Sequence, residues 1–451
     1  MKRIAIVGGG LAGVASAYFQ RKRWKKEAQI FLIEKTARCG GWIQSLLHEG
    51  FFFEQGPRSF RGGPENRHVL ALIEEIGLQQ DLVGSHPSCL TRYLYLEGKL
   101  QALPRNIFSF LCSPLSKGMW KALFQSCQKN ILPSDETITD FFTRYLPPAW
   151  VKRLIEPLIS GIYAGDPTQL SIQSCFPRLH RAVIEKGSLL LGGMAIRKTP
   201  SLSPISPWVA HAEAFPSFSF QSGLHQLIDR LLEKACPELL CNTTIDAPIW
   251  KDQTILLPLS SGNTLAVDAL IFALPFSSLG ELLPPLRPLL EVTPFASVAM
   301  IHYGYSQKVL QTPGFGYLVP FEPGNPVLGV TFDSCFFPQH NKESQERITV
   351  MMGGMRHPNT LDLSDAELFA IAERALRQQM GILVSPALRE IRRLRHAIPQ
   401  YHLGHQSRCR ALHALLESLY PRLSITGSCI AGISMPEVLL HAQQLSSQLS
   451  N

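Results

Sequence analysis

The feature that most constrains the fold is a glycine-rich turn that follows a short apolar run at the start of the chain. Residues 4–7 are apolar, and Gly8, Gly10 and Gly13 follow them with the spacing G-x-G-x-x-G. In a strand–turn–helix unit the first glycine allows a tight turn, the second leaves room for a pyrophosphate, and the third lets the helix pack against the strand. The N-terminus of the helix then offers free N–H groups to the phosphates. The motif predicts a βαβ unit that binds a dinucleotide.

The residues after this turn strengthen that prediction and narrow the cofactor. A second apolar run, residues 29–33, ends in Glu34, about 20 residues past the motif, where an acid can bind the ribose. The alternative, a glycine-rich turn in an ordinary α/β domain, would not need this acid. A second glycine pair, Gly40 and Gly41, then precedes Trp42. FAD is extended and its flavin end needs further bare backbone, whereas NAD needs no such pair, so the sequence favours FAD.

The C-terminal end of the chain returns to glycine-rich turns. An apolar run at 270–274 stops at Pro275 and resembles the last strand of a dinucleotide-binding sheet. A later strand ends at Gly427, and a helix is predicted to begin at Pro436, because proline is favoured in the first helical turn. The N-terminus of that helix would stabilise the negative charge of a reduced flavin. We therefore expect a nucleotide-binding domain made from both ends of the chain, with other domains inserted.

Composition and charge exclude several classes of protein. Apolar residues make up 45% of the 451 residues and charged residues 17%, so the chain can form a large core and does not read as disordered. A net charge of +8 suits nucleic acid, an anionic membrane surface or an acidic substrate, and nucleic acid ranks last because no such motif is present. The ten cysteines show neither C-x-x-C nor zinc-ligand spacing, which indicates reduced thiols in a cytosolic protein. The sequence shows no signal peptide, and no apolar run approaches the ~20 residues of a membrane span.

The middle of the chain shows two kinds of pattern. Residues 104–200 read as helical, and the apolar and basic residues of 107–124 suit a buried helix and a helix on a membrane surface equally well. A hairpin is predicted over 90–103 and a connector over 201–220. Alternating runs after residue 295 predict a second sheet. These runs are 297–305, 316–319, 327–332 and 347–352, and helices are predicted over 70–78, 221–235 and 365–380.

Several longer motifs resemble one family. The chain resembles the oxygen-dependent, FAD-containing protoporphyrinogen oxidases, a family that includes coproporphyrinogen III oxidases and lies within the amine-oxidase superfamily. The resemblance covers nearly the whole chain, and the middle and late motifs are specific to this family. The motifs are 40–43, 53–58, 156–165, 170–177, 314–320, 350–354 and 398–405.

This resemblance implies an α/β fold with three domains. It combines a discontinuous Rossmann-like FAD-binding domain, an inserted substrate-binding α+β domain and a helical membrane-binding domain. It also favours the membrane-surface interpretation of residues 107–124. The FAD-binding domain would comprise 1–88, 221–275 and 395–451, the substrate-binding domain 89–103, 206–220 and 276–394, and the helical domain 104–205.

The resemblance also implies the reaction. Protoporphyrinogen IX would lose six electrons in steps to the flavin, and oxygen would reoxidise the flavin to give hydrogen peroxide. A hydride would pass from a meso carbon to flavin N5, and aromatisation of the ring drives the step, so no catalytic side chain and no metal are expected. The clustered histidines His396, His402 and His405 therefore suit a surface or packing role better than a catalytic one.

The family motifs assign the substrate-binding residues one by one. Arg92 would pair with a propionate, because a guanidinium binds a carboxylate with two parallel hydrogen bonds. The flat apolar ring would lie between Phe315, Leu318 and Met351, and Gly161 would admit it near the flavin. Without the resemblance, Arg92 suits a solvated strand charge and the apolar residues suit core packing.

FAD would be bound by glycine turns at both ends of the chain and by the residues beside them. One motif departs from the family, because Pro436 stands where the family commonly has asparagine. That change puts a side-chain contact in doubt and leaves the backbone contacts in place. The expected FAD-binding residues are Gly8, Gly9, Gly10, Leu11, Ala12, Gly13, Glu34, Lys35, Arg38, Gly40, Gly41, Trp42, Gly56, Pro57, Arg58, Ile245, Gly427, Gly432, Ile433, Ser434 and Met435.

Three alternatives stay open from the sequence. The same chemistry on coproporphyrinogen III, which has four propionates, is the nearest, and Arg92 with its aromatic strand favours protoporphyrinogen IX. An amine oxidase or a carotenoid desaturase is disfavoured because the chain shows no clear aromatic pair for the flavin. A non-catalytic protein that binds FAD and porphyrin is disfavoured because the glycine turns are intact. We expect a cytoplasmic protein, peripheral on the membrane, with porphyrinogen and oxygen as partners, a homodimer allowed and no nucleic acid.

Overall fold

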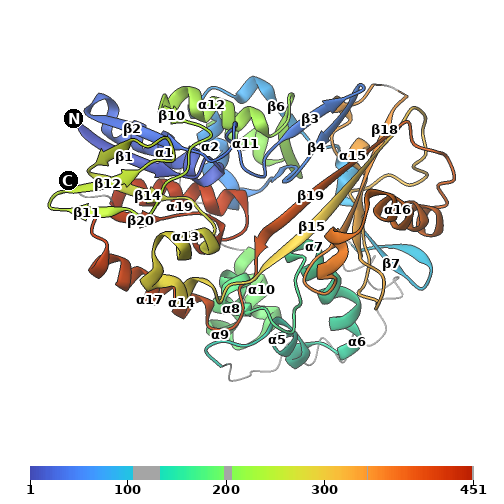
Figure 1. Cartoon of the computed structure of the whole chain (residues 1–451). Helices are drawn as coiled ribbons and strands as arrows, with labels where there is room; N and C mark the ends of the chain where they lie inside the picture. Colours follow the sequence, from blue (N-terminus) through green and yellow to red (C-terminus); the bar gives the residue numbers. More distant parts are fainter. Residues whose placement is uncertain (105–132, 198–205, 343, 449–451) are drawn as a thin grey trace.

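Five parallel strands form the sheet around which the N- and C-terminal parts of the chain fold (Figure 1). The computed structural model describes residues 1–104, 133–197, 206–342 and 344–448. Apolar runs form these strands, and both faces of the sheet are covered, so Ile4 and Ala5 are fully buried on opposite faces. In spatial order the strands are β10 (Glu238–Leu240), β2 (Ala28–Ile33), β1 (Lys2–Val7), β14 (Ala269–Phe272) and β20 (Leu423–Ile425).

This order confirms the prediction that both ends of the chain build one sheet. It also corrects one detail, because β14 lies between β1 and β20 and is therefore not the last strand. The layer of helices on one face contains α1 (Leu11–Trp24), α12 (His225–Ala235) and α19 (Met435–Gln448). The other face is covered by α13 (Phe276–Leu282), α14 (Arg287–Leu290), α17 (His405–Leu419) and a small sheet of β11 (Ile249–Lys251), β12 (Thr254–Pro258) and β13 (Thr264–Val267).

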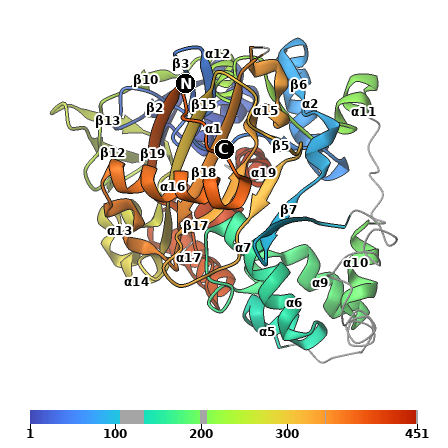
Figure 2. The same cartoon turned by 90° about the vertical axis from the view of Figure 1, so that its right-hand side faces the viewer.

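A second, seven-stranded sheet lies beside the first. Its neighbouring strands are antiparallel except for β16 and β7, and β15 and β19 are its longest strands. The predicted helix α16 (Asp365–Met380) packs on one face, where Leu368 and Leu376 join the core of the sheet (Figure 2). The order is β19 (Leu388–Pro399), β15 (Phe295–Tyr305), β18 (Glu346–Gly353), β17 (Val327–Thr331), β16 (Gly316–Leu318), β7 (Tyr93–Leu96) and β8 (Lys99–Ala102).

Residues 133–197 form a group of short helices around their own apolar core, which contains Phe141, Tyr145 and Tyr163. This confirms the helical prediction for that stretch, whereas the amphipathic segment 107–124 lies outside the described residues. Within the part of the chain that the structure describes, no helix is both long and apolar enough to cross a bilayer. The helices are α5 (Ile138–Tyr145), α6 (Pro148–Trp150), a π-helical turn (Val151–Ile155), α7 (Glu156–Tyr163), α8 (Ile172–Cys175), α9 (Pro177–Lys186) and α10 (Leu189–Arg197).

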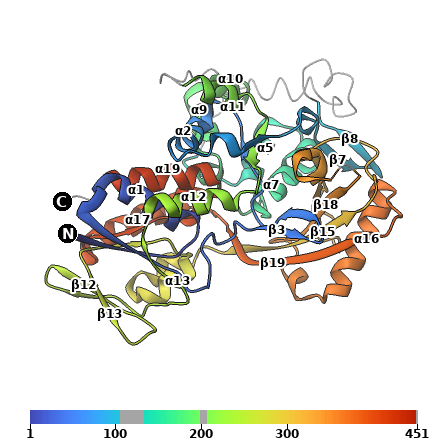
Figure 3. The same cartoon turned by 90° about the horizontal axis from the view of Figure 1, so that it is seen from above.

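The predicted connector 201–220 is regular where it is described. It forms α11 (Pro207–Glu213), which lies on the same side of the molecule as α9 and α10 (Figure 3), and β9 (Ser217–Phe220). Proline at the start of α11 signals a helix N-terminus as well as a loop, which explains the wrong prediction. The remaining elements are β3 (Ser45–His48), β4 (Phe51–Glu54), β5 (Phe60–Arg61), α2 (Arg67–Glu75), β6 (Leu82–Gly84), α15 (Asp333–Phe336) and α18 (Ser428–Ala431).

Candidate functional site

The turn between β1 and α1 has the geometry that its glycines predict. Gly8 has a φ of +107°, and a Cβ on Gly13 would lie 1.8 Å from the Gly8 carbonyl oxygen, so only glycine lets the helix approach this closely. A Cβ on Gly10, in contrast, would meet nothing within 4 Å. Because α1 starts at Leu11 without a side-chain cap, its first N–H groups stay available to a ligand. A free helix N-terminus beside open space is what a pyrophosphate requires.

The second glycine turn lies directly against the first. The Gly40 N–H donates to the Gly9 carbonyl at 2.7 Å, and a Cβ on Gly41 would lie 3.2 Å from the Gly10 Cα. Farther along, a Cβ on Gly56 would lie 2.0 Å from the Trp42 carbonyl oxygen. Two bare turns therefore approach each other by their backbones. This arrangement fits FAD.

Two predicted FAD-binding side chains hold these turns in shape. Arg38 donates to the carbonyl oxygens of Cys39, Gly41 and Ile43, so its guanidinium supports the turn itself. The Glu34 carboxylate accepts the Gly9 N–H at 2.7 Å. It also accepts the Thr36 N–H at 2.9 Å and the Thr36 hydroxyl at 2.8 Å, and Lys35 beside it is exposed.

The C-terminal turns reach the same place. Ala12 on α1 lies next to Gly427, where a Cβ would be 3.8 Å from the Ala12 Cβ, and both Gly427 and Gly432 have a φ of +116°. At the start of α19, Ser434 and Glu437 bond each other's backbone N–H and side chain. Sequence reasoning missed this cap, although the S-x-x-E spacing is its ordinary signal. Glu437 therefore already lies at the helix N-terminus that was expected to face the flavin.

Four further FAD-binding candidates differ in their surroundings. Ile433 packs against the core of the helical group, and Met435 packs against the core beside α1. Ile245 is buried and bridges to Leu259 at the edge of the small sheet. Pro57 lies between Gly56 and Arg58 in a partly buried turn. Their contact with FAD stays a prediction.

The substrate candidates lie together on the second sheet. The Arg92 guanidinium lies 5.0 Å from the centroid of the Phe315 ring, and Phe315 packs edge-on against Phe336. Among the described residues the Arg92 side chain has no hydrogen-bond or ion-pair partner. Burial and the positive charge of Arg61 lower the pKa of Arg92. Arg92 is exposed to solvent. An unpaired guanidinium on an aromatic ring is suited to bind an anion.

The apolar candidates Leu318 and Met351 lie in one row across β16, β17 and β18. A Cβ on Gly161 would lie 2.6 Å from a Leu318 methyl carbon, so a larger residue on α7 would require the Leu318 side chain to shift. Leu318 pairs with Gly329 across the sheet, and Gly329 pairs with Met351. Met351 is partly buried against the cluster that contains Ala164. The structure therefore brings Gly161, Leu318 and Met351 together.

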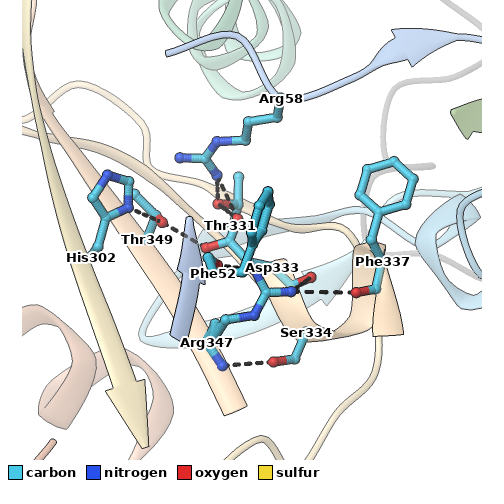
Figure 4. A network of polar contacts seen from close by, with 9 residues as sticks. All are labelled: Phe52, Arg58, His302, Thr331, Asp333, Ser334, Phe337, Arg347 and Thr349. Atoms are coloured by element: carbon cyan, nitrogen blue, oxygen red, sulfur yellow. Dashed lines mark hydrogen bonds and ion pairs between the residues drawn. The ribbon is translucent and has the colours of Figure 1, made fainter. Parts of the chain in front are cut away.

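Arg58 belongs to a polar network that reaches the second sheet (Figure 4). Its guanidinium bonds Thr331 and forms an ion pair with Asp333 at 3.0 Å, and its expected contact with FAD stays a prediction. The other Asp333 oxygen accepts the Thr349 hydroxyl at 2.6 Å, and Thr349 contacts His302. The second terminal nitrogen of Arg58 is buried without a partner in the described atoms.

The same network continues through a buried arginine. Arg347 donates to the carbonyl oxygens of Phe52, Asp333 and Phe337 (Figure 4), and burial lowers the pKa of Arg347 to about 10. It links β4 to the second sheet. Burial, together with the nearby charge of Arg58, lowers the pKa of His302 to about 3, so this histidine is neutral at pH 7. Sequence reasoning missed this network because its members are far apart in the chain.

Glu54 is a partly buried acid on β4, beside the start of α12. It accepts the Leu224 N–H at 2.7 Å and the Ser45 hydroxyl at 2.9 Å. Burial raises the pKa of Glu54 to about 8 despite these bonds.

His405, one of the clustered histidines, stacks on Tyr401 at 4.3 Å, and burial lowers its pKa to about 4, which confirms its packing role.

Comparisons with known proteins agree with this geometry. The family of flavin containing amine oxidoreductases matches residues 25–446. The chain is 31% identical over 476 residues to protoporphyrinogen oxidase of Bos taurus, covering 99% of this chain and 98% of that one. It is 27% identical over 458 residues to coproporphyrinogen III oxidase of Bacillus subtilis (strain 168), covering 97% and 96%.

The solved structures that resemble this chain extend the comparison to the fold. The crystal structure of a proposed protoporphyrinogen oxidase from Exiguobacterium sp. 255-15 superimposes with a TM-score of 0.85 at 25% identity, covering 99% of this chain and 98% of that one. A reduced UDP-galactopyranose mutase superimposes with a TM-score of 0.72 at 15% identity, covering 99% and 95%, and shares the fold alone.

Proposed function

Because the chain belongs to the flavin-containing amine oxidoreductase family, we propose that it oxidises protoporphyrinogen IX to protoporphyrin IX with FAD as its cofactor. The observation that carries this substrate is the unpaired Arg92 guanidinium on the Phe315 ring, beside the wall of Leu318 and Met351. An apolar wall with one cation at its edge matches an apolar ring that carries carboxylates. When bound, FAD supplies a two-electron acceptor, and dioxygen is the proposed final acceptor, with hydrogen peroxide as by-product.

The side chains of the site would position the ring and take no part in proton transfer. Arg92 would fix one propionate and thereby the orientation of the macrocycle. Leu318, held against Gly161, and Met351 would exclude water from the face of the ring. Positioning in a dry pocket accounts for the chemistry, because loss of the hydride leads to an aromatic product.

Coproporphyrinogen III is the second candidate substrate. The relative from Bacillus subtilis carries that name, and it is similar over nearly the whole chain. The choice depends on how many propionates find cations at the rim of the site.

Purified protein supplied with both porphyrinogens in air tests this proposal. We expect a yellow protein, a flavin absorbance spectrum, and porphyrin fluorescence that rises much faster with protoporphyrinogen IX. A faster rise with coproporphyrinogen III would select the second candidate. A yellow protein that gives no fluorescence with either substrate would be a non-catalytic binding protein and would overturn both.

The division into FAD-binding, substrate-binding and helical domains belongs to the same proposal. Exposed apolar side chains on α9 and α10 support a membrane-facing role for the helical domain. They are Ile184, Leu190, Leu191 and Met194, and Lys186 lies among them in the sequence. The proposed location is cytoplasmic and peripheral, with a homodimer as the proposed assembly.

Co-flotation with vesicles of anionic lipid tests the membrane contact. The native protein should float, and the double variant L191E/M194E should stay with the soluble fraction while keeping its flavin. A double variant that floats as well as the native protein would remove these helices from the membrane contact.

A further inference from the structure

Arg61 presents a second unpaired guanidinium near Arg92. It ends β5, where it pairs with Ser217, and its carbonyl accepts the Asn66 side-chain amide at 2.8 Å. The next residue is fixed too, since a Cβ on Gly62 would lie 1.7 Å from the Phe215 carbonyl oxygen. The backbone at Arg61 is therefore closely packed, whereas its side chain is exposed and has no hydrogen-bond or ion-pair partner among the described residues.

A chain of contacts places this segment beside the Arg92 platform. Arg58, from the same segment, reaches Thr331 and Asp333 at the end of β17. The intervening Phe332 donates its N–H to the Phe315 carbonyl at 3.0 Å, and Phe315 carries the Arg92 guanidinium. The charge of Arg61 also contributes to the lowered pKa of Arg92, as expected for neighbouring cations.

Asp333, which follows β17, is already engaged. It pairs with Arg58 and accepts the Thr349 hydroxyl. Two like charges held close together repel each other, and a ligand with two carboxylates would remove that repulsion.

We propose that Arg61 is a second carboxylate-binding residue of the substrate site, so that Arg61 and Arg92 each bind one propionate on the same edge of the porphyrinogen. This proposal rests on the proposed function. On this proposal, the two arginines bind the edge of the ring that carries the adjacent propionates. The rest of the ring then faces Gly161, Leu318 and Met351. Arg61 is therefore a specificity-determining residue that contacts substrate without taking part in the redox step.

Binding of the air-stable product isolates this contact from turnover. Protoporphyrin IX and its dimethyl ester are titrated, in the same detergent, into FAD-loaded native protein and into R61Q, R92Q and R61Q/R92Q, with binding followed by the porphyrin absorbance shift. R287Q is the matched control, because Arg287 forms an exposed pair with Glu291 on α14. Flavin content and thermal unfolding check that each variant is folded.

We expect R61Q and R92Q each to weaken binding of protoporphyrin IX roughly tenfold, as for a lost charged hydrogen-bond pair. The dimethyl ester should bind all proteins with the same, weaker affinity, because its esters give the arginines no charge to pair with. R287Q should match the native protein.

Three results would overturn the proposal, and each has a different meaning. If R61Q binds the diacid as tightly as the native protein while R92Q does not, the pocket takes porphyrin and Arg61 is not part of it. If R61Q weakens the ester as much as the diacid, Arg61 acts on the fold and not on a carboxylate. If the native protein binds neither compound, the proposed function itself fails, and this inference fails with it.

Discussion

The glycine turns around Gly10 and the arginine corner around Phe315 are the two ends of one proposed site, and they are specified differently. At the first end, bare backbone approaches bare backbone, as the 2.7 Å bond from Gly40 to Gly9 shows. At the second end, side chains from separate segments make the surface, with Arg92 at 5.0 Å from the Phe315 ring centroid. At the first end, Glu34 and Arg38 bond the backbone of the turns, whereas at the second end Arg92 has no polar partner among the described residues. We therefore propose that backbone geometry retains the cofactor and that side-chain chemistry selects the substrate.

The largest effect is expected from a substitution in the glycine turn between β1 and α1. Gly13→Ala places a Cβ against the Gly8 carbonyl oxygen at 1.8 Å, so α1 must move away from β1. We expect a loss of about 3 kcal/mol or more in the free energy of unfolding and loss of FAD, measured by denaturant titration and flavin absorbance. The matched control is Gly193→Ala on α10, where a Cβ meets nothing within 4 Å. An alanine variant at residue 13 with native flavin content would show that the helix can retreat without cost.

The next largest effect concerns Arg347, the buried arginine that links β4 to the second sheet. Arg347→Met leaves the Phe52, Asp333 and Phe337 carbonyl oxygens without their buried donor. We expect the free energy of unfolding to fall by about 2–3 kcal/mol. Arg395→Met, which breaks an exposed pair with Asp362, should cost less than about 1 kcal/mol. Equal losses in both variants would contradict a special role for the buried arginine.

Glu54 should make stability depend on pH. Its pKa is about 8 in the folded protein, above its ordinary value, so the native state holds a proton that the unfolded state releases. Stability is therefore greatest below the unfolded pKa and declines as pH rises towards 8. Between pH 6 and 7 the decline should be about 1.4 kcal/mol, and Glu54→Gln should remove it.

Thermal unfolding at several pH values measures this slope. Glu97→Gln is the control, because Glu97 forms an exposed ion pair with Arg153 and should leave the slope unchanged. If Glu54→Gln keeps the native slope, the carboxyl is ionised in the fold and its burial is offset by the nearby arginines.

The smallest effect is expected from a substitution of Phe315, the ring on which the Arg92 guanidinium lies. Phe315→Leu removes the aromatic platform of Arg92 and keeps an apolar residue in its place. A cation–π contact of about 1 kcal/mol corresponds to a roughly fivefold rise in KM for the porphyrinogen, with flavin content unchanged. Phe369 on α16 lies under the Arg389 guanidinium, so Phe369→Leu is the control and should leave KM at the native value. Identical kinetics for both variants would show that the platform does not position Arg92.

The same contrast explains what the sequence could predict. The turn at Gly8–Gly13, the acid Glu34 and the apolar strands are local patterns. The parallel sheet confirms the strands, and the ribose contact of Glu34 stays a prediction. Family motifs were needed to find Arg92 and Phe315, whose local patterns suit ordinary strand and core residues.

Other features had no local signal at all. The Arg58–Asp333 pair joins residues 275 positions apart, so no spacing rule could place Arg58 there. The raised pKa of Glu54 depends on its burial on β4 beside the start of α12, which a sequence pattern does not report. Contacts made through folding, rather than through spacing, define the substrate end.

One variant tests most directly whether the two ends are independent. In Arg92→Gln, flavin content and the KM for protoporphyrinogen IX are measured on the same preparation. If different residues bind the cofactor and the substrate, the variant should keep its native flavin content. Its KM should rise roughly tenfold, because one charged hydrogen-bond pair with the substrate is lost. A native KM, or flavin lost in proportion to activity, would contradict it.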